Sequence, residues 1–268
     1  MAAALGALGV RQGRRVVVAE VQQRSDVEHV VTAAGADHVS IDPQAAMEEY
    51  LRDQLPGPLA EALAASRAFA YFAAATPGMR ELLTAGKIWE LAQDERRTPG
   101  ARPYDLVVVD APATGHGVAV LAAPRTFADA AMVGPIARQG RIISEMLGDP
   151  ARTAVVAVTT PEEMPVNETL ALRAALAADA GQRPALIVVN ALRRLRLTAQ
   201  EAARLEAEAD GHPAVAAALA AHRHAGEQRS QLRRLRRHAR GTPTVTLPFT
   251  PGEPDVAALA RRLEEAVR

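Results

Sequence analysis

One segment, residues 104–121 with the sequence YDLVVVDAPATGHGVAVL, constrains the fold of this chain more than any other. Its unbroken apolar run at 106–109 is typical of a strand that is covered on both faces of a parallel sheet. The chain after Asp110 cannot extend that strand, because Pro112 lacks a backbone donor and the glycines that follow loosen the chain. Ligands of open α/β sheets bind at the carboxyl ends of the strands. Asp110 therefore predicts a ligand site at that edge.

The residue types around Asp110 suit a magnesium nucleotide. A carboxylate at a strand end can anchor the water shell of Mg²⁺, and a loop of small residues lets the backbone approach phosphate. A second interpretation is that Asp110 only caps the helix that follows. From the strand and the acid alone, the two interpretations stand equal.

Length and composition bound the remaining classes. A chain of 268 residues fits one large α/β domain, or one domain with a helical insertion. The formal net charge of +0 gives no global electrostatic reason to bind nucleic acid or an anionic membrane surface. The chain has no cysteine, which excludes disulfides, thiolate metal sites and cysteine nucleophiles. No run approaches the roughly 20 apolar residues of a spanning helix, and no signal peptide is evident, so we expect a cytoplasmic protein.

Other short apolar runs predict further strands, and each of them ends in a polar or turn-forming residue and leads into a helix. These runs lie at residues 16–19, 153–158, 186–190 and 244–247. The alternation of strand and helix predicts an α/β fold with a doubly wound, mostly parallel sheet. A short alternating run at 39–41 precedes Asp42 and Pro43, which begin a helix in the favoured way.

Two helical segments interrupt this pattern, at about 43–96 and 124–149. Their apolar residues include Met79 and Trp89 in the first segment and Met132 and Met146 in the second. The two segments would together offer an apolar surface to a client, or they would pack on each other and stay closed. Ordinary core packing is the simpler interpretation for any single one of these residues.

The loop after the strand resembles a known signature. ATPases of the ArsA/Get family, which includes arsenite-pump (anion-transporting) ATPases and ATPases that target tail-anchored membrane proteins, carry D-T-A-P-T-G-H after the Walker B strand. This chain has D-A-P-A-T-G-H, so Asp110, Thr114, Gly115 and His116 match and the proline falls one place early. The stretch P-G-M-R-E-L-L-T-A-G-K, at 77–87, is similar to one in the bacterial branch.

The resemblance implies a fold of the P-loop NTPase type (SIMIBI class), with residues 1–268 as a single nucleotide-binding domain whose helical insertions form a subdomain. It also implies ATP and Mg²⁺ as cofactors. Asp110 would hold the water shell of the metal, and the loop through Thr114, Gly115 and His116 would act as switch II. Gln22 lies near the family's switch I position, where it would orient the attacking water.

Other positions carry competing interpretations. By the same resemblance Asn190 would read the adenine and Phe249 would stack on it, although an asparagine at a strand end is also a common turn residue. Glu20 and Asp26 are nearby carboxylates that would substitute for Gln22 in switch I. They are equally well explained as a polar residue at the sheet edge and a helix cap.

The family's phosphate-binding loop, G-K-G-G-V-G-K-[ST], does not occur in the sequence. Its one Gly-Lys pair, Gly86 and Lys87, lies in a helical context. This Walker A loop supplies backbone N–H groups and a lysine to the phosphates. Either the start of the protein lies upstream or nucleotide turnover has been lost. We favour the first explanation, because the chain begins with a helix in mid-pattern and lacks the family's first strand, which would leave the centre of the sheet unfilled.

We therefore expect the body of an ArsA/Get-type ATPase that couples hydrolysis of Mg-ATP to movement of its helical subdomain. It would be a homodimer, or a heterodimer with a related ATPase, and would act on an apolar client or a membrane protein. Because the chain has no cysteine, the sequence does not support arsenite as the species that the protein binds and transports. A nucleotide-blind partner subunit is the alternative, and a partitioning ATPase of similar fold is a weaker one. The arginine run at 229–240 is typical of a solvated amphipathic helix, so we expect no nucleic-acid partner.

Overall fold

The computed structural model describes residues 1–21, 25–67, 75–96, 100–208 and 212–267. The chain divides into two compact units. The first consists of Met1–Ala154, Ala175–Gln182 and Val256–Arg261, and the second of Val155–Ala174, Arg183–Asp255 and Arg262–Arg268. Each unit contains a three-stranded sheet whose strands are all parallel.

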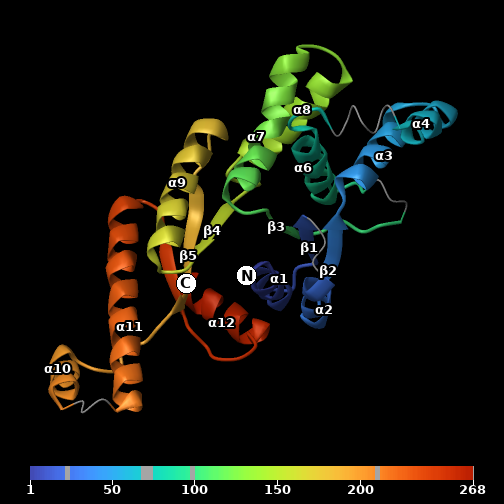
Figure 1. Ribbon diagram of the computed structural model, residues 1–268. Coiled ribbons are helices and arrows are strands. Elements are labelled where there is room, and N and C mark those ends of the chain that lie inside the picture. The colour runs from blue at the N-terminus through green and yellow to red at the C-terminus, as the bar shows by residue number, and fades with distance from the viewer. Residues whose placement is uncertain (22–24, 68–74, 97–99, 209–211, 268) are drawn as a thin grey trace. The chain divides into compact units, whose positions relative to one another are not determined.

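The first unit alternates strands and helices along the chain (Figure 1). Its elements are α1 (Ala2–Arg11), β1 (Val16–Val21), α2 (Ser25–Ala33), β2 (Asp37–Ile41), α3 (Pro43–Gln54), α4 (Gly57–Ala64), α6 (Met79–Leu91), β3 (Leu106–Asp110), α7 (Thr114–Ala131) and α8 (Pro135–Gly148). Asp42 caps α3 by accepting hydrogen bonds from the backbone N–H groups of Gln44 and Ala45, as its sequence predicts.

The sheet of the first unit has the order β2-β1-β3, so β1 is paired on both sides. Val17, Val18 and Ala19 of β1 are completely buried. Such a run of β-branched and small apolar residues suits a strand with both faces covered. The register places Ala19 beside Val109 and Glu20 beside Asp110. The two acidic residues therefore lie side by side at the carboxyl edge.

Helices cover both faces of this sheet (Figure 1). Val16 and Val18 pack with Ala2 of α1 and Val31 of α2 on one face. Ala19, the next residue along β1, packs on the other face with side chains of α6, α7 and α8. The alternation of side chains along the strand thus gives two cores from one sequence run.

Glycines allow α1 to lie close to the sheet. A Cβ atom on Gly9 would lie 2.8 Å from Val16 Cγ2 and 2.9 Å from Leu106 Cδ2, and one on Gly6 would lie 2.7 Å from Val18 Cγ2. Both distances from Gly9 are shorter than carbon atoms normally approach. The helix ends at Arg11, and Gly13 follows with φ +77°, a left-handed conformation that glycine adopts readily after a helix.

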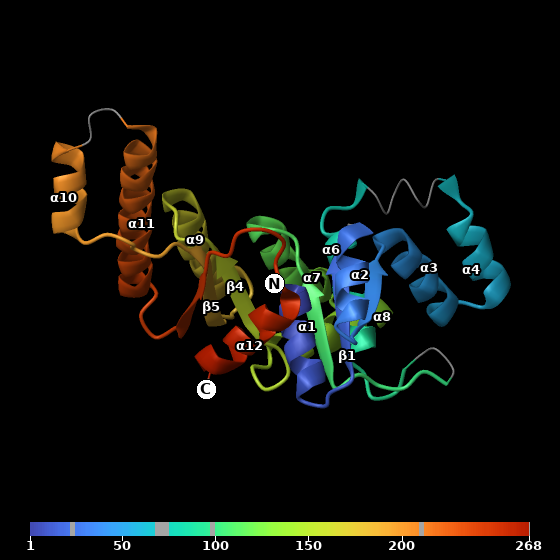
Figure 2. The same cartoon turned by 90° about the horizontal axis from the view of Figure 1, so that it is seen from below.

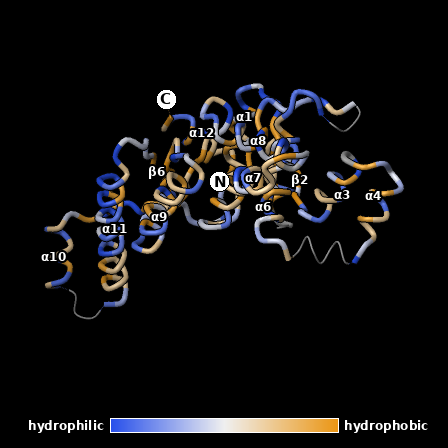
Figure 3. The backbone as a smooth tube through the Cα atoms, turned by 90° about the horizontal axis from the view of Figure 1, so that it is seen from above, coloured by the Kyte–Doolittle hydropathy of each residue, from blue (hydrophilic) through white to orange (hydrophobic). Residues whose placement is uncertain are grey.

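The second unit is built around the sheet β4-β5-β6. Its elements are β4 (Val155–Thr159), α9 (Glu163–Asp179), β5 (Pro184–Leu192), α10 (Ala199–Ala207), α11 (Pro213–His238), β6 (Thr244–Pro248) and α12 (Val256–Val267), the ends of α9 and α12 being shared with the first unit. Ile187 and Val189 of β5 pack with Leu232 and Leu235 of α11. Figure 2 shows α10 beside α11, and Figure 3 shows hydrophilic and hydrophobic bands alternating along α11.

The predicted α/β class with parallel strands is confirmed. The strands form two three-stranded sheets in the described structure, and a single doubly wound sheet stays a prediction. The strand at 106–109 is only half-buried, in contrast to the expectation, because among the described residues β3 pairs with β1 alone. The buried strand of this sheet is β1.

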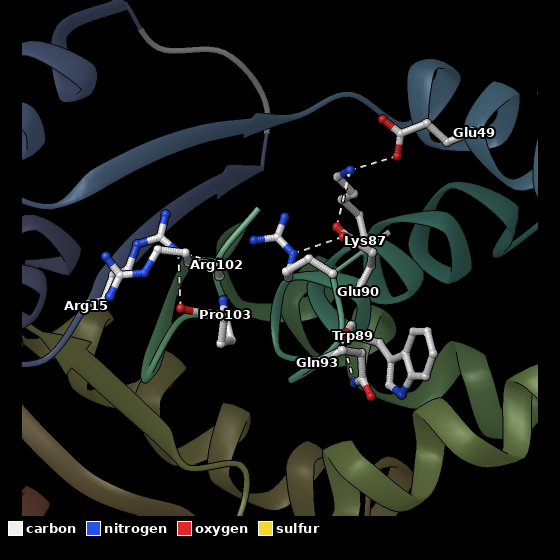
Figure 4. A network of polar contacts seen from close by, with 9 residues as sticks. Arg15, Glu49, Lys87, Trp89, Glu90, Gln93, Arg102 and Pro103 are labelled. Carbon is white, nitrogen blue, oxygen red and sulfur yellow. Dashed lines mark hydrogen bonds and ion pairs between the residues drawn. The ribbon is translucent and has the colours of Figure 1, made fainter. Parts of the chain in front are cut away.

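A network of charged residues holds α6 against α3 and the segment before β3 (Figure 4). Lys87 Nζ lies 2.7 Å from Glu49 Oε2 and 3.4 Å from Glu90 Oε2, and Arg96 Nε donates to Glu90 Oε1 at 3.0 Å. Arg15 and Arg96 each place a guanidinium over the Tyr104 ring, at 4.3 and 5.0 Å. Burial raises the pKa of Glu90, but Arg96 and Lys87 outweigh burial and leave that pKa below its ordinary value of 4.5.

The close approach of α1 predicts opposite effects for one substitution at two glycines. Gly9→Ala should lower the free energy of unfolding by about 1–3 kcal/mol, because the new methyl group meets Val16 and Leu106. Gly226→Ala should raise it by roughly 0.5–1 kcal/mol, since Gly226 lies inside α11 with open space around it. Urea-induced unfolding of both variants measures the two effects. Equal effects would show that α1 does not depend on its glycine contact.

The network around Glu90 predicts a loss of stability in acid. A carboxylate whose pKa is lowered in the folded state stabilises the fold above its unfolded pKa, and this contribution is lost as the pH falls through the folded value. The free energy of unfolding should therefore fall below about pH 4.5, and Glu90→Gln should reduce that pH dependence. Glu48→Gln, which alters an exposed ion pair with Arg52, is the control. If the free energy of unfolding changed with pH in the same way in wild type, Glu90→Gln and Glu48→Gln, Glu90 would not be the source of the loss in acid.

Candidate functional site

The strand order of the first unit contains a topological switch point. The chain leaves β1 through α2 to reach β2 on one side, and then returns through α3, α4 and α6 to β3 on the other side of β1. Ligands of such sheets bind at the carboxyl ends of the strands, at the point where the strand order reverses. In this unit the order reverses between β1 and β3.

Two carboxylates meet at that point. Glu20 is the last residue but one of β1, and Asp110 is the last residue of β3. The two residues are register partners in a parallel pair, so their side chains leave the sheet on the same face. Glu20 is only 2% exposed, whereas Asp110 is exposed to solvent. His38 Nε2 of β2 lies 3.2 Å from Glu20 Oε2, so a neighbouring strand supplies a partner for the buried acid.

The segment after Asp110 turns at once into a helix. α7 begins at Thr114, whose φ of +36° is unusual for a residue other than glycine. A Cβ atom on Gly117 would lie 2.8 Å from the Pro112 carbonyl oxygen, so the turn requires glycine there. The first turn of α7 has no side-chain cap, which leaves its backbone N–H groups available to an anion.

Two expectations about this segment are corrected. Thr114, Gly115 and His116 form the first turn of α7 and not a loop, because the tertiary context overrides the weak helix propensity of these small residues. The interpretation of Asp110 as a helix cap is wrong, since α7 begins four residues later with Ala113 as its cap position. His116 is exposed, and its Nδ1 lies 3.8 Å from Glu81 Oε1.

The carboxyl edge of the second sheet carries the other predicted residues. Asn190 lies in β5, which continues to Leu192 past a register shift, and Ala191 has a left-handed backbone with φ +59°. Phe249 follows β6 directly, and the residue is 43% exposed. The guanidinium carbon of Arg193 lies 4.2 Å from the centre of that ring.

A polar cluster adjoins this edge within the second unit. Gln228 of α11 donates to Glu162 Oε1 at 2.7 Å, and His224 Nε2 lies 3.7 Å from the same oxygen. Burial raises the pKa of Glu162, but hydrogen bonds from Thr160, Gln228 and His224 outweigh burial and lower that pKa below its ordinary value. Glu162 is therefore ionised at neutral pH.

The predicted site residues thus fall into two groups. Asp110, Thr114, Gly115 and His116 lie together in the first unit, and Asn190 and Phe249 lie together at the edge of the second sheet. Gln22 lies outside the described residues.

Sequence reasoning did not find His38 as the partner of Glu20, nor the cluster around Gln228. Only the pairing of β1 with β2 reveals the first of these. A signal for the second was present in the sequence, because Gln228 lies four residues before Leu232 and so interrupts the buried stripe of α11 with a polar residue.

Two negative findings concern the described residues. No group of three or more His, Cys, Asp or Glu residues among them is arranged to hold a metal ion by itself. Across the same part of the chain, no helix has the length and apolar character that crossing a membrane requires.

Comparison with known proteins gives one set of relatives. The chain is 32% identical over 190 residues to ATPase BagA of Mycobacterium tuberculosis, an alignment that covers 63% of this chain and 54% of the relative. Proteins of Mycobacterium bovis and of a second M. tuberculosis strain, also named as ATPases, match equally well. The chain spans about half the length of these curated relatives. No family model matches the chain.

The pairing of His38 with Glu20 predicts a difference between neighbouring residues of β2. His38→Ala should lower the free energy of unfolding by about 1–3 kcal/mol, because a buried carboxylate loses a hydrogen-bond partner. Asp37→Ala removes an exposed ion pair with Arg15 and should cost at most about 1 kcal/mol. Urea-induced unfolding of the two variants provides the comparison. A smaller effect at His38 than at Asp37 would contradict the proposed pairing.

Proposed function

We propose that this chain is the body of an ArsA/Get-type ATPase, which binds Mg-ATP at the carboxyl ends of β1 and β3. One observation carries the proposal: Glu20 and Asp110 lie side by side where the strand order of the sheet reverses. The T-G-H signature, which begins four residues after Asp110, forms the start of α7, where the N-cap residue makes no side-chain hydrogen bond. The similarity to proteins named as ATPases supports it.

The residues present fit magnesium. Mg²⁺ prefers oxygen ligands and usually binds one or two carboxylates, nucleotide phosphates and water, without a cage made of protein alone. Asp110 offers an exposed carboxylate in that position, and Glu20 a buried one beside it. When bound, the ion would neutralise charge on the phosphates during their transfer.

The residues at this edge would have separate roles in binding the metal and the phosphates. Asp110 would hold the water shell of the metal, and His38 keeps the Glu20 carboxylate in place next to it. The backbone N–H groups at the start of α7 would face phosphate oxygens, which the positive end of a helix attracts. Gln22 would orient the attacking water in switch I, as glutamines do in other NTPases. Thr114, Gly115 and His116 would move with the nucleotide as switch II.

The base of ATP would bind at the carboxyl edge of the second sheet. Asn190 offers a side-chain amide that would read the edge of adenine, and the half-exposed ring of Phe249 would stack on its face. Asn190 lies near the carboxyl end of β5, and Phe249 directly follows β6. The two strands are neighbours in one parallel sheet, and this supports a shared role.

We also propose that the chain binds a client. The apolar surface available to that client is smaller than the sequence indicates. Ile143, Met146 and Leu147 of α8 are buried against α6 and are therefore occupied in the core. Met132, which is 74% exposed, and Val133 lie at the turn between α7 and α8 and would contact an apolar client or a membrane protein. We further propose a cytoplasmic homodimer, or a heterodimer with a related ATPase.

A nucleotide-blind partner subunit is the second candidate. The sequence contains no Gly-Lys-Ser or Gly-Lys-Thr, so these 268 residues do not supply the lysine and hydroxyl of a Walker A loop. Such a protein would bind a related ATPase and hydrolyse nothing.

The proposal predicts that Asp110 is required for turnover. Asp110→Asn should lower ATP hydrolysis at least about 100-fold, because anchoring of the metal is worth several kcal/mol in the transition state. Asp129→Asn, an exposed carboxylate in α7, should leave the rate unchanged. Phosphate release in the presence of Mg²⁺ measures both.

Equal rates in wild type and Asp110→Asn would contradict the proposed site. A wild-type protein that hydrolyses no ATP but purifies with a related ATPase would instead favour the nucleotide-blind partner.

A further inference from the structure

Gln228 is a buried side-chain amide whose hydrogen bonds all go to one edge of the second sheet. It is 2% exposed. Its Oε1 accepts the Arg193 backbone N–H at 2.8 Å, and its Nε2 donates to Glu162 Oε1 at 2.7 Å and lies 3.5 Å from the Ala191 carbonyl oxygen. Gln228 thus ties α11 to the segment after β4 and to the end of β5.

Arg193 is held from several directions. Gln228 accepts its N–H, and Arg229, the next residue of α11, donates to its carbonyl oxygen at 2.9 Å. With the backbone fixed in this way, the guanidinium of Arg193 lies 4.2 Å from the centre of the Phe249 ring. The Phe249 backbone N–H donates to the Leu192 carbonyl oxygen at 3.0 Å. A continuous chain of contacts therefore runs from α11 to the exposed ring.

The backbone at this edge is held in an unfavourable conformation. Ala191 has φ +59°, a left-handed conformation that residues with a Cβ atom rarely adopt. The pairing of β5 with β6 also shifts register between Val189 and Leu192. Such backbone persists only where its surroundings fix it, and it concentrates at ligand sites. Gln228 supplies the fixing contacts, and a fully satisfied buried amide specifies geometry more narrowly than an apolar side chain would.

We propose that Arg193 and Phe249 form a preformed stacking platform for the base of the nucleotide, and that Gln228 is the positioning residue that holds it. This inference rests on the proposed nucleotide function and goes beyond it by assigning Arg193 and Gln228. The guanidinium covers one face of the ring, so the base stacks on the other face. A cation that lies flat on an aromatic ring also fixes the orientation of that ring. The platform gains affinity because no side chain has to be ordered when the base arrives.

The test separates the base from the phosphates. Affinities for ATP and for inorganic tripolyphosphate, both with Mg²⁺, are measured by calorimetry, and their ratio reports the contribution of the base. Wild type should prefer ATP by about tenfold or more, as stacking on one aromatic ring provides. Gln228→Met, which keeps the volume, should lower that ratio about fivefold or more and leave tripolyphosphate binding unchanged. Arg193→Ala, at a half-buried position, should do the same.

Gln231→Met is the matched control, because Gln231 lies on the same helix and accepts a hydrogen bond from Arg234, three residues further along that helix. Amide hydrogen exchange without nucleotide gives a second readout. The Arg193 N–H should exchange at least about tenfold faster in Gln228→Met than in wild type, since its acceptor is gone.

The outcomes are distinguishable. A wild-type protein without preference for ATP over tripolyphosphate would overturn the proposed base site and this inference together. A wild-type preference that Gln228→Met retains, although Arg193 exchanges faster, would overturn the inference alone and leave the proposed function standing. Loss of affinity for both ligands in Gln228→Met would indicate a general structural role and would also overturn it.

Discussion

The pairing of β1 on both of its sides is the constraint on which the first unit depends. A strand in the middle of a parallel sheet has no face open to water, so Val17, Val18 and Ala19 must be apolar and helices must cover both faces. Because β2 and β3 flank β1 on opposite sides, the strand order reverses between β1 and β3, where ligands of such sheets bind. The position of the candidate site is thus a consequence of strand order.

Burial of a carboxylate at that edge costs free energy, and a neighbouring side chain offsets this cost. Glu20 is almost completely buried, and burial of a carboxylate is unfavourable unless hydrogen bonds satisfy it. His38 provides such a partner from the adjacent strand, while Asp110 remains in contact with solvent. Two acids of different exposure therefore stand in register at one point. The second sheet shows a comparable arrangement, in which Gln228 satisfies the segments that follow β4 and β5.

Much of this organisation could be predicted from local sequence. The apolar runs gave the α/β class, Asp42 marked the start of α3, and Gly13 marked the turn after α1. The sequence could not show that 106–109 forms a less buried strand than 16–19, because an apolar run does not reveal how many neighbours a strand has. It also could not show that Thr114 begins a helix, since the small residues T-G-H-G have weak helix propensity and tertiary contacts decide their conformation. The contacts of His38 and Gln228 join residues far apart in the chain and are visible only after folding.

The central claim is that a metal nucleotide binds between the ends of β1 and β3. Mn²⁺ can replace Mg²⁺ beside ATP, and as a paramagnetic ion it broadens the NMR signals of nearby backbone amides. The account predicts that broadening on addition of Mn-ATP centres on the amides of Glu20, Asp110 and the first turn of α7. Broadening centred on the opposite, amino-terminal edge of this sheet, or independent of ATP, would contradict it.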